Sequence, residues 1–280
     1  MTAIRESSEL VLEATSRPAL GQALRELVAF RGTILAFAER DVRVKYKQAV
    51  LGVAWALIQP LAFLAIFALF FGRLAKIGGD GVPYAAFALT ALVPWNYIAT
   101  TVSFGSAALL NDASLVRKVY FPREVPVLAA AVAAMVDFSA GLVAFLALGP
   151  VLGAHPSWTA LLAPLLLPLV AVPAVGLSLA LAALNVYYRD FRYALPLGIQ
   201  LWMFASPVAY PLTKIPVEWQ LLYAFLNPVA GPLEGFRRVL GLGVLPSAEL
   251  LIASLVGGLV WLWLGYRLFK AMEPNFADVI

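Results

Sequence analysis

The sequence contains no cysteine and only one histidine among its 280 residues. The absence of cysteine excludes a disulfide framework, a thiolate nucleophile and a cysteine-ligated metal site. The single histidine, His155, cannot build a histidine-cluster metal site alone. Chemistry that depends on thiols or on groups of histidines is therefore not expected here.

Three motifs of nucleotide and hydrolytic chemistry are also absent. No G-x-x-x-x-G-K-[ST] occurs, so the chain has no P-loop to hold the phosphates of ATP. Neither the G-x-S-x-G of serine hydrolases nor the H-E-x-x-H of zinc proteases occurs. We therefore expect no ATP hydrolysis, no metal and no cofactor in this chain itself.

Charged residues are scarce, at 13% of the chain, while hydrophobic residues make up 62% and the mean hydropathy is +0.87. A soluble domain of this length does not need so much apolar surface, whereas a protein that crosses the membrane several times does. The net charge of +4 does not indicate nucleic acid as a partner, because no basic patch with interleaved aromatics lies on a soluble domain. The basic residues lie where anionic headgroups of membrane lipids would attract them.

Long runs with little or no charge predict membrane spans, which need about 20 apolar residues each. There are six such runs, at residues 50–72, 84–110, 125–149, 160–188, 194–212 and 250–269. An even number places both termini on one side of the membrane. Most of the 20 Lys and Arg residues fall on that side, which predicts that both termini are cytoplasmic. The sequence thus predicts an all-α integral membrane protein, with a polar tail over 1–21 and a transmembrane domain over 22–280.

Residues 22–47 are predicted to form an amphipathic helix that lies in the membrane interface, because the apolar residues share one arc at about 100° per residue. The opposite arc carries Arg25, Arg40, Arg43 and Lys47. Three charged residues depart from this pattern, namely Arg31, Asp41 and Lys45.

The connector 111–124 is predicted to contain a short cytoplasmic helix. Asp112 or Ser114 can cap its start and Pro122 can end it. The segment suits docking to a soluble partner, and an ordinary connecting turn is the alternative. Its candidate contact residues are Asp112, Ser114, Arg117, Lys118 and Tyr120.

The connector 213–248 is the largest on the opposite side. Two short helices are expected within it, at 221–226 and 233–240, each too short to span a bilayer. Such pieces are typical of re-entrant or interfacial helices, which can cover an exit.

Asp137 is the only acid well inside a predicted span. It can serve an ion-coupled carrier, or it can bond to a neighbouring helix, for example near Ser139. The chain is therefore either a pore domain driven by a separate energy-supplying subunit, or an intramembrane enzyme or ion-coupled carrier. The scarcity of catalytic and ion-coupling residues favours the first.

Several ordered motifs lie between about residues 25 and 270. The first runs from Arg40 through Trp55 to Gln59-Pro60-Leu61, and 111–124 is another. The others are Leu92-Val-Pro-Trp-Asn96, Asn185-Val-Tyr-Tyr-Arg-Asp-Phe191, Ser206-Pro-Val-Ala-Tyr-Pro211, and Asn227-Pro228 with Glu234-Gly-Phe-Arg237. Together, these motifs resemble the permeases of bacterial polysaccharide-export ABC transporters.

This resemblance implies the transmembrane subunit of a type-2 ABC exporter in the bacterial cytoplasmic (inner) membrane. It would form a homodimer with two separate ATPase subunits, which would bind ATP and magnesium. The substrate would be a polysaccharide on undecaprenyl pyrophosphate, such as O antigen in lipopolysaccharide biosynthesis, or a teichoic acid. Residues 22–47 would be the interface helix, 111–124 the coupling helix and 213–248 the outer gate. The polar tail 1–21 is longer than the family pattern. A drug or small-lipid exporter is the alternative.

Candidate substrate residues follow from this expectation. Arg40, Arg43 and Lys47 share one helical face before the first span, so they can bind the carrier pyrophosphate, or they can simply anchor the helix at the interface. Aromatic rings stack on the apolar faces of sugars, and they are also routine as lipid-facing or packing residues. The candidate channel aromatics are Phe63, Phe67 and Phe70, with Phe71 on the same face, and Trp95, Tyr97 and Phe104 on the second span.

Overall fold

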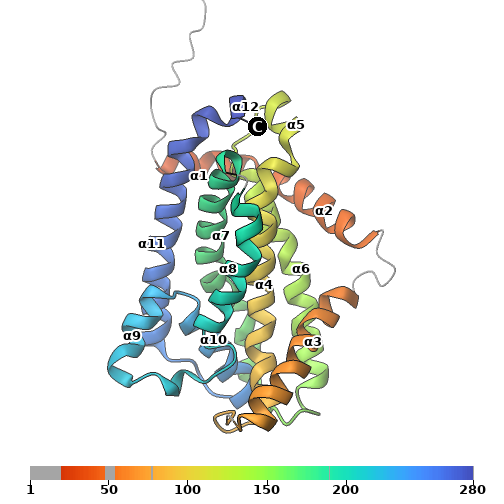
Figure 1. The fold of residues 1–280 in the computed structure, drawn as a ribbon, viewed down its shortest axis with the longest axis vertical. Coiled ribbons are helices and arrows are strands. Elements are labelled where there is room, and N and C mark those ends of the chain that lie inside the picture. The colour runs from red at the N-terminus through yellow and green to blue at the C-terminus, as the bar shows by residue number, and fades with distance from the viewer. Residues whose placement is uncertain (1–19, 48–53, 77, 189, 280) are drawn as a thin grey trace, which may run out of the picture.

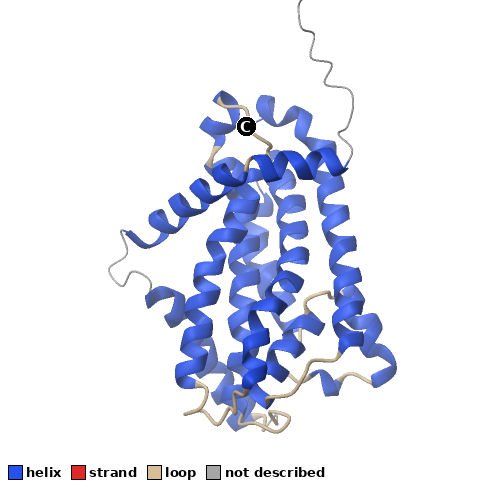
Figure 2. Cartoon of the chain, turned by 180° about the vertical axis from the view of Figure 1, so that it is seen from behind, coloured by secondary structure: helices blue, strands red, loops and turns tan. Residues whose placement is uncertain are grey.

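The computed structural model describes residues 20–47, 54–76, 78–188 and 190–279, and in these ranges the chain is helical with no strand. Long helices run side by side along the longest axis (Figure 1). Short helices close both ends of this bundle, and Figure 2 shows the same arrangement from behind. The predicted all-α fold is confirmed.

Four helical segments are long and apolar enough to cross a membrane. They are α4 (Tyr84–Asn111), α6 (Val125–Leu148), the 3₁₀ turn η3 (Trp158–Leu162) with α7 (Ala163–Tyr187), and α11 (Ala248–Met272). Helix α4 is the central helix, because most of its side chains are buried by its neighbours. The chain is therefore a multi-pass membrane protein, and four of the six predicted spans appear as span-length helices.

The other two predicted spans are shorter or irregular. Helix α3 (Trp55–Phe67) continues as a π-helix, η2 (Ala68–Leu74). Helix α8 (Asp190–Ala205) ends well before the predicted limit of 194–212. The α conformation is disfavoured for Ser206 because Pro207 follows it, and this explains why the helix ends there.

The predicted interface helix 22–47 is two helices. Helix α1 (Leu20–Ala29) and helix α2 (Arg31–Lys47) meet at Phe30, where backbone hydrogen bonds of 3.0 Å continue on both sides. The pair crosses one end of the bundle, and α2 then slopes down beside it (Figure 1). The same end carries α5 (Ala113–Lys118), η6 (Glu273–Asn275) and α12 (Phe276–Val279).

Helices α7 and α11 pack closely because glycines face each other. A Cβ atom on Gly265 would lie only 1.9 Å from the carbonyl oxygen of Gly176. A side chain at this point would force the two helices apart. The glycines therefore set how closely these two membrane helices approach.

The opposite end folds back on itself through η4 (Leu212–Lys214), α9 (Val217–Leu226), α10 (Ala230–Phe236) and the π-helix η5 (Arg237–Leu242). The two short helices expected in this connector are confirmed as helices. Asn227 joins them to the end of α8, because its amide donates to Ser206 Oγ at 2.9 Å and accepts from Trp202 Nε1 at 3.0 Å.

Arg237 is buried in this end of the molecule, with 1% of its surface exposed. Its guanidinium donates to Glu234 and to the Pro207 carbonyl oxygen, each at 2.7 Å, and lies 3.7 Å from the centre of the Phe87 ring. Arg237 therefore connects α10 to the segment after α8 and to α4, and its charge is paired inside the protein.

Candidate functional site

A pocket of about 260 Å³ lies between α3, α4 and α8, and we call it the inter-helix pocket. Its walls combine two aromatic rings, three side-chain amides and small or apolar groups. The lining residues are Gln59, Pro60, Phe63, Leu92, Trp95, Asn96, Ala99, Ser103, Pro196, Ile199, Gln200 and Met203. Rings beside hydrogen-bonding amides suit a ligand that has both apolar faces and hydroxyl groups.

The structure brings two of the six candidate aromatics to this pocket, Phe63 and Trp95. Trp95 is held edge-on by Trp202 at 5.4 Å between ring centres. The side chain of Phe67 is buried against Phe71, with ring centres 5.3 Å apart. The predicted face of α3 is therefore divided between the pocket and the protein core.

The remaining three candidate aromatics lie outside the pocket. Tyr97 is fully buried and packs against Phe138 at 6.2 Å, so it belongs to the core. Phe70 and Phe104 are about half exposed, and Phe104 lies under the ammonium group of Lys45 at 5.3 Å. These placements differ from the expectation of one continuous aromatic lining, because α4 is covered by other helices on most of its surface.

The three amides of the pocket, Gln59, Asn96 and Gln200, were missed by sequence reasoning. They are uncharged, so they do not interrupt a hydrophobic run and give no signal in a search for charges. Gln59 and Asn96 do lie in motifs of the resemblance, which is the signal that pointed nearest to them.

Arg40, Arg43 and Lys47 lie on one side of α2 and line an open cavity of about 380 Å³ together with Glu39. Arg43 is exposed and pairs with Glu39 one turn away. The three basic residues thus share a surface, as their spacing indicates. Only Arg43 and Lys47 present their cations mainly to the outside.

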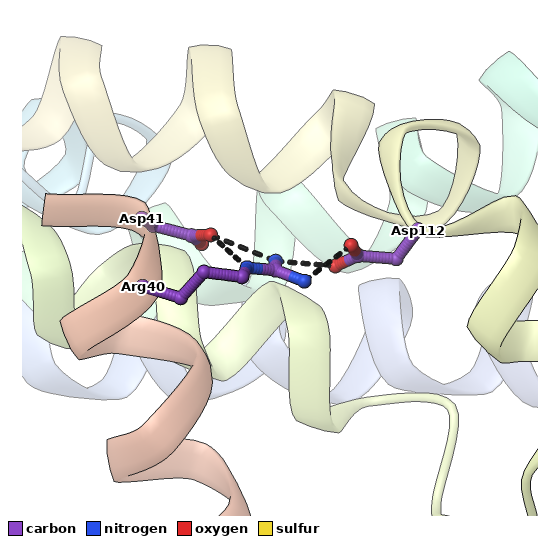
Figure 3. A network of polar contacts seen from close by, with 3 residues as sticks. All are labelled: Arg40, Asp41 and Asp112. Atoms are coloured by element: carbon purple, nitrogen blue, oxygen red, sulfur yellow. Dashed lines mark hydrogen bonds and ion pairs between the residues drawn. The ribbon is translucent and has the colours of Figure 1, made fainter. Parts of the chain in front are cut away.

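Arg40 is already bound to two carboxylates (Figure 3). Its guanidinium donates to both oxygens of Asp112, at 2.7 and 2.8 Å, and to Asp41, at 2.7 and 3.0 Å. The hydrogen bonds that Arg40 donates to Asp112 raise the pKa of Arg40, so this guanidinium stays charged. A phosphate at Arg40 would have to displace a carboxylate, and the observed role of this arginine is to join α2 to the chain just before α5.

Helix α5 presents most of the predicted contact residues at the surface. Ser114, Arg117, Lys118 and Tyr120 are exposed, while Val116 is fully buried beneath them. Tyr120 donates a hydrogen bond to Glu26 of α1 at 3.1 Å.

The expected side-chain cap of α5 is wrong in its detail. Asp112 does precede the helix, but its carboxylate makes no capping hydrogen bond, and Ser114 lies inside the helix and not at its N-cap. The Asp112 carboxylate binds Arg40 instead, and a charge-assisted bidentate pair outweighs a bond to one backbone N–H.

Asp137 bonds to a neighbouring element, and that element is α2. Lys45 Nζ lies 2.5 Å from Asp137 Oδ2, and the Tyr46 hydroxyl donates to Oδ1. Ser139 bonds within its own helix, to the Met135 carbonyl oxygen. The ranges that the structure describes contain no group of three or more side chains that could hold a metal ion. With both oxygens of Asp137 engaged, the geometry favours a structural contact over an ion relay.

Comparisons with known proteins agree with this architecture. Residues 33–240 match the model of the family described as ABC-2 type transporter. The chain is 29% identical to the O-antigen export system permease protein RfbA of Myxococcus xanthus, over 92% of this chain and 98% of that protein. It is 25% identical to a Klebsiella pneumoniae protein of the same name, over 88% and 94%. It is 22% identical to the polysialic acid transport protein KpsM of Escherichia coli, over 86% and 93%. The family match covers well over half of the chain, which therefore belongs to the ABC-2 type transporters.

Proposed function

We propose that this chain is the transmembrane subunit of an exporter that moves a polysaccharide on a lipid pyrophosphate carrier, such as undecaprenyl pyrophosphate. The observation that carries the proposal is the inter-helix pocket, in which Phe63 and Trp95 lie beside the amides of Gln59, Asn96 and Gln200. The names of the similar proteins, two O-antigen permeases and a polysialic acid transporter, point the same way.

The pocket chemistry fits a sugar chain better than a purely apolar ligand. Aromatic rings bind the C–H faces of sugars, and amides can both donate to and accept from hydroxyl groups. Pro60 and Pro196 lie on two of the three lining helices, where they remove backbone donors and favour bends. A drug or small-lipid exporter would have less use for three amides in a membrane pocket, because each costs free energy to bury without a partner.

The assembly we propose contains two copies of this chain and two ATPase subunits, which supply ATP and magnesium binding. It lies in the bacterial inner membrane with both termini in the cytoplasm. Helix α5 contacts the ATPase with its exposed face, which carries Lys118. The segment α3–η2 and helix α8 complete six spans, and α9 and α10 form a re-entrant outer gate.

The carrier pyrophosphate is proposed to bind at the cavity beside α2. Arg43 and Lys47 contribute the accessible cations there, and Arg40 takes part only by exchanging a carboxylate for a phosphate. Phosphate oxygens accept charge-assisted hydrogen bonds, and a guanidinium can bind two of them at once. Helix α2 starts at the end of the molecule that carries α5 (Figure 1), which in this proposal is the cytoplasmic end, where a lipid headgroup would lie.

The proposal is tested by measuring ATP hydrolysis of the purified complex with and without lipid-linked glycan. We expect glycan to stimulate the unchanged complex, and Phe63→Ala or Gln200→Leu to weaken that stimulation by about tenfold, the effect of losing about 1.4 kcal/mol of binding. Trp263→Ala is the matched control, because Trp263 is an exposed ring on α11 outside the pocket. Equal stimulation in all variants would refute the assignment of the pocket.

A further inference from the structure

Helix α2 is fixed to the membrane helices at a second polar contact, away from Asp112. Asp137 lies about halfway along α6 and is 2% exposed. Lys45 and Tyr46 of α2 engage its two carboxylate oxygens, one each. We call these three residues the α2 latch.

An interfacial helix does not need such a contact, because its apolar face is sufficient to hold it on a membrane. A buried carboxylate is costly unless it is paired and hydrogen-bonded, and the latch supplies both a cation and a hydroxyl. The contact is also directional, since rotating α2 by one residue would turn Lys45 about 100° away from α6. The latch therefore fixes the position and rotation of α2 against α6.

The same helix holds the start of α5. Arg40 binds Asp112, the residue directly before α5, while Lys45 binds the middle of α6. The two residues of α2 are five positions apart, which is roughly 7.5 Å along a helix. One short segment of α2 thus contacts both the residue before the proposed ATPase contact and a membrane helix, and Figure 3 shows the first of these two contacts.

We propose that Lys45, Tyr46 and Asp137 position α2 so that it transmits movement of α5 to α6 during transport. This route acts beside the covalent connector 119–124. The inference rests on the proposed function only in taking α5 as the contact with the ATPase. The three residues are positioning residues, and in this account Asp137 carries no transported ion.

The first test uses the full complex with its ATPase, reconstituted in lipid vesicles. In Asp137→Asn and Lys45→Gln, we expect ATP hydrolysis to continue while the glycan transported per ATP falls on the order of tenfold, within the usual range of coupling between sites. A purely structural role would instead lower both activities together with the amount of folded protein. Unchanged transport per ATP in both variants would overturn the proposal.

A covalent replacement for the latch makes the test sharper. Val42 and Ala134 both line a cavity of about 30 Å³ beside Asp137, one from α2 and one from α6. The chain has no native cysteine, so Val42→Cys with Ala134→Cys creates a single reversible crosslinking pair. In the Asp137→Asn background, crosslinking should restore transport per ATP, and reduction should abolish it again. If the crosslinked variant stays impaired, Asp137 acts otherwise than by holding α2.

The crosslinking yield tests the latch independently of the substrate. The cysteine pair alone should crosslink efficiently and transport normally, whereas adding Asp137→Asn should lower the yield because α2 is no longer held. An equal yield in both backgrounds would overturn the latch. If the unchanged complex transported no glycan while the yields differed as expected, the proposed function would fail and the latch would stand.

Discussion

Arg40 shows how one residue can have a different role from the one that its charge indicates. A basic residue before a membrane span is usually interpreted as a phosphate ligand or an interface anchor. The guanidinium of Arg40, however, is bound by Asp112 and Asp41. Burial raises the pKa of Asp41, and the hydrogen bond from Arg40 opposes this rise by favouring the charged carboxylate. One of the two partners of Arg40, Asp112, lies 72 positions away in the chain, which no local spacing could reveal.

A double-mutant cycle tests the pair of Arg40 and Asp112. We expect Arg40→Gln to lower the thermal midpoint of the purified complex more than Asp112→Asn does, because it leaves two carboxylates without their cation. The double variant should be little worse than Arg40→Gln alone, with a coupling of about 1–2 kcal/mol, since Asp112 is buried but Arg40 is partly exposed. Additive effects would show that the pair contributes nothing.

The same variants separate the two roles of Arg40. Asp112→Asn weakens the hold of residue 112 on the guanidinium of Arg40. If Arg40 also recognises the pyrophosphate, this variant should respond to lower concentrations of lipid-linked glycan than the unchanged complex. A response that is unaltered would limit Arg40 to its structural role and leave Arg43 and Lys47 as the phosphate ligands.

At the scale of elements, hydropathy predicts the long spans well and the irregular ones poorly. Helices α4, α6, α7 and α11 agree closely with the predicted runs, because only membrane helices need such long apolar segments. Hydropathy could not show that α8 ends at Ala205, since Val208 and Ala209 are equally apolar and buried outside a helix. The amphipathic pattern also predicted a single helix over 22–47, where the structure has two helices. Asp41 and Lys45 depart from that pattern, and these are the residues that bind Arg40 and Asp137 respectively.

Helix α5 makes a prediction at this scale. Lys118→Glu should weaken co-purification with the ATPase subunit or reduce the transport obtained per ATP, because the exposed face of α5 is its proposed docking surface. Membrane insertion should be unaffected. Lys214→Glu is the matched control, since Lys214 is an exposed lysine among the short helices at the opposite end of the bundle. Normal binding and transport in Lys118→Glu would show that α5 is an ordinary connector.

At the scale of the whole molecule, α1, α5 and α12 lie at one end of the bundle, and the short helices α9 and α10 lie at the other (Figure 1). The inter-helix pocket lies among α3, α4 and α8. The pocket could be foreseen only in part, because the sequence identified Phe63 and Trp95 as aromatics of α3 and α4 but could not show which rings are buried. Which rings are buried depends on how the helices pack against each other, and the spacing of residues along the sequence does not reveal this packing. Arg40 and the latch place two charge contacts between α2 and the rest of the chain, and these contacts are the basis for the proposal that α2 moves together with α5 and α6.

The most direct test of the account is transport itself. Permease and ATPase are reconstituted in vesicles with lipid-linked glycan in the outer leaflet and ATP outside, and the glycan that becomes protected from an added glycosidase is measured. The account predicts protection that requires ATP, the ATPase and this chain together, and that falls in Phe63→Ala. No protection of glycan by the complete complex, with ATP-dependent movement of a small lipid or drug instead, would contradict it.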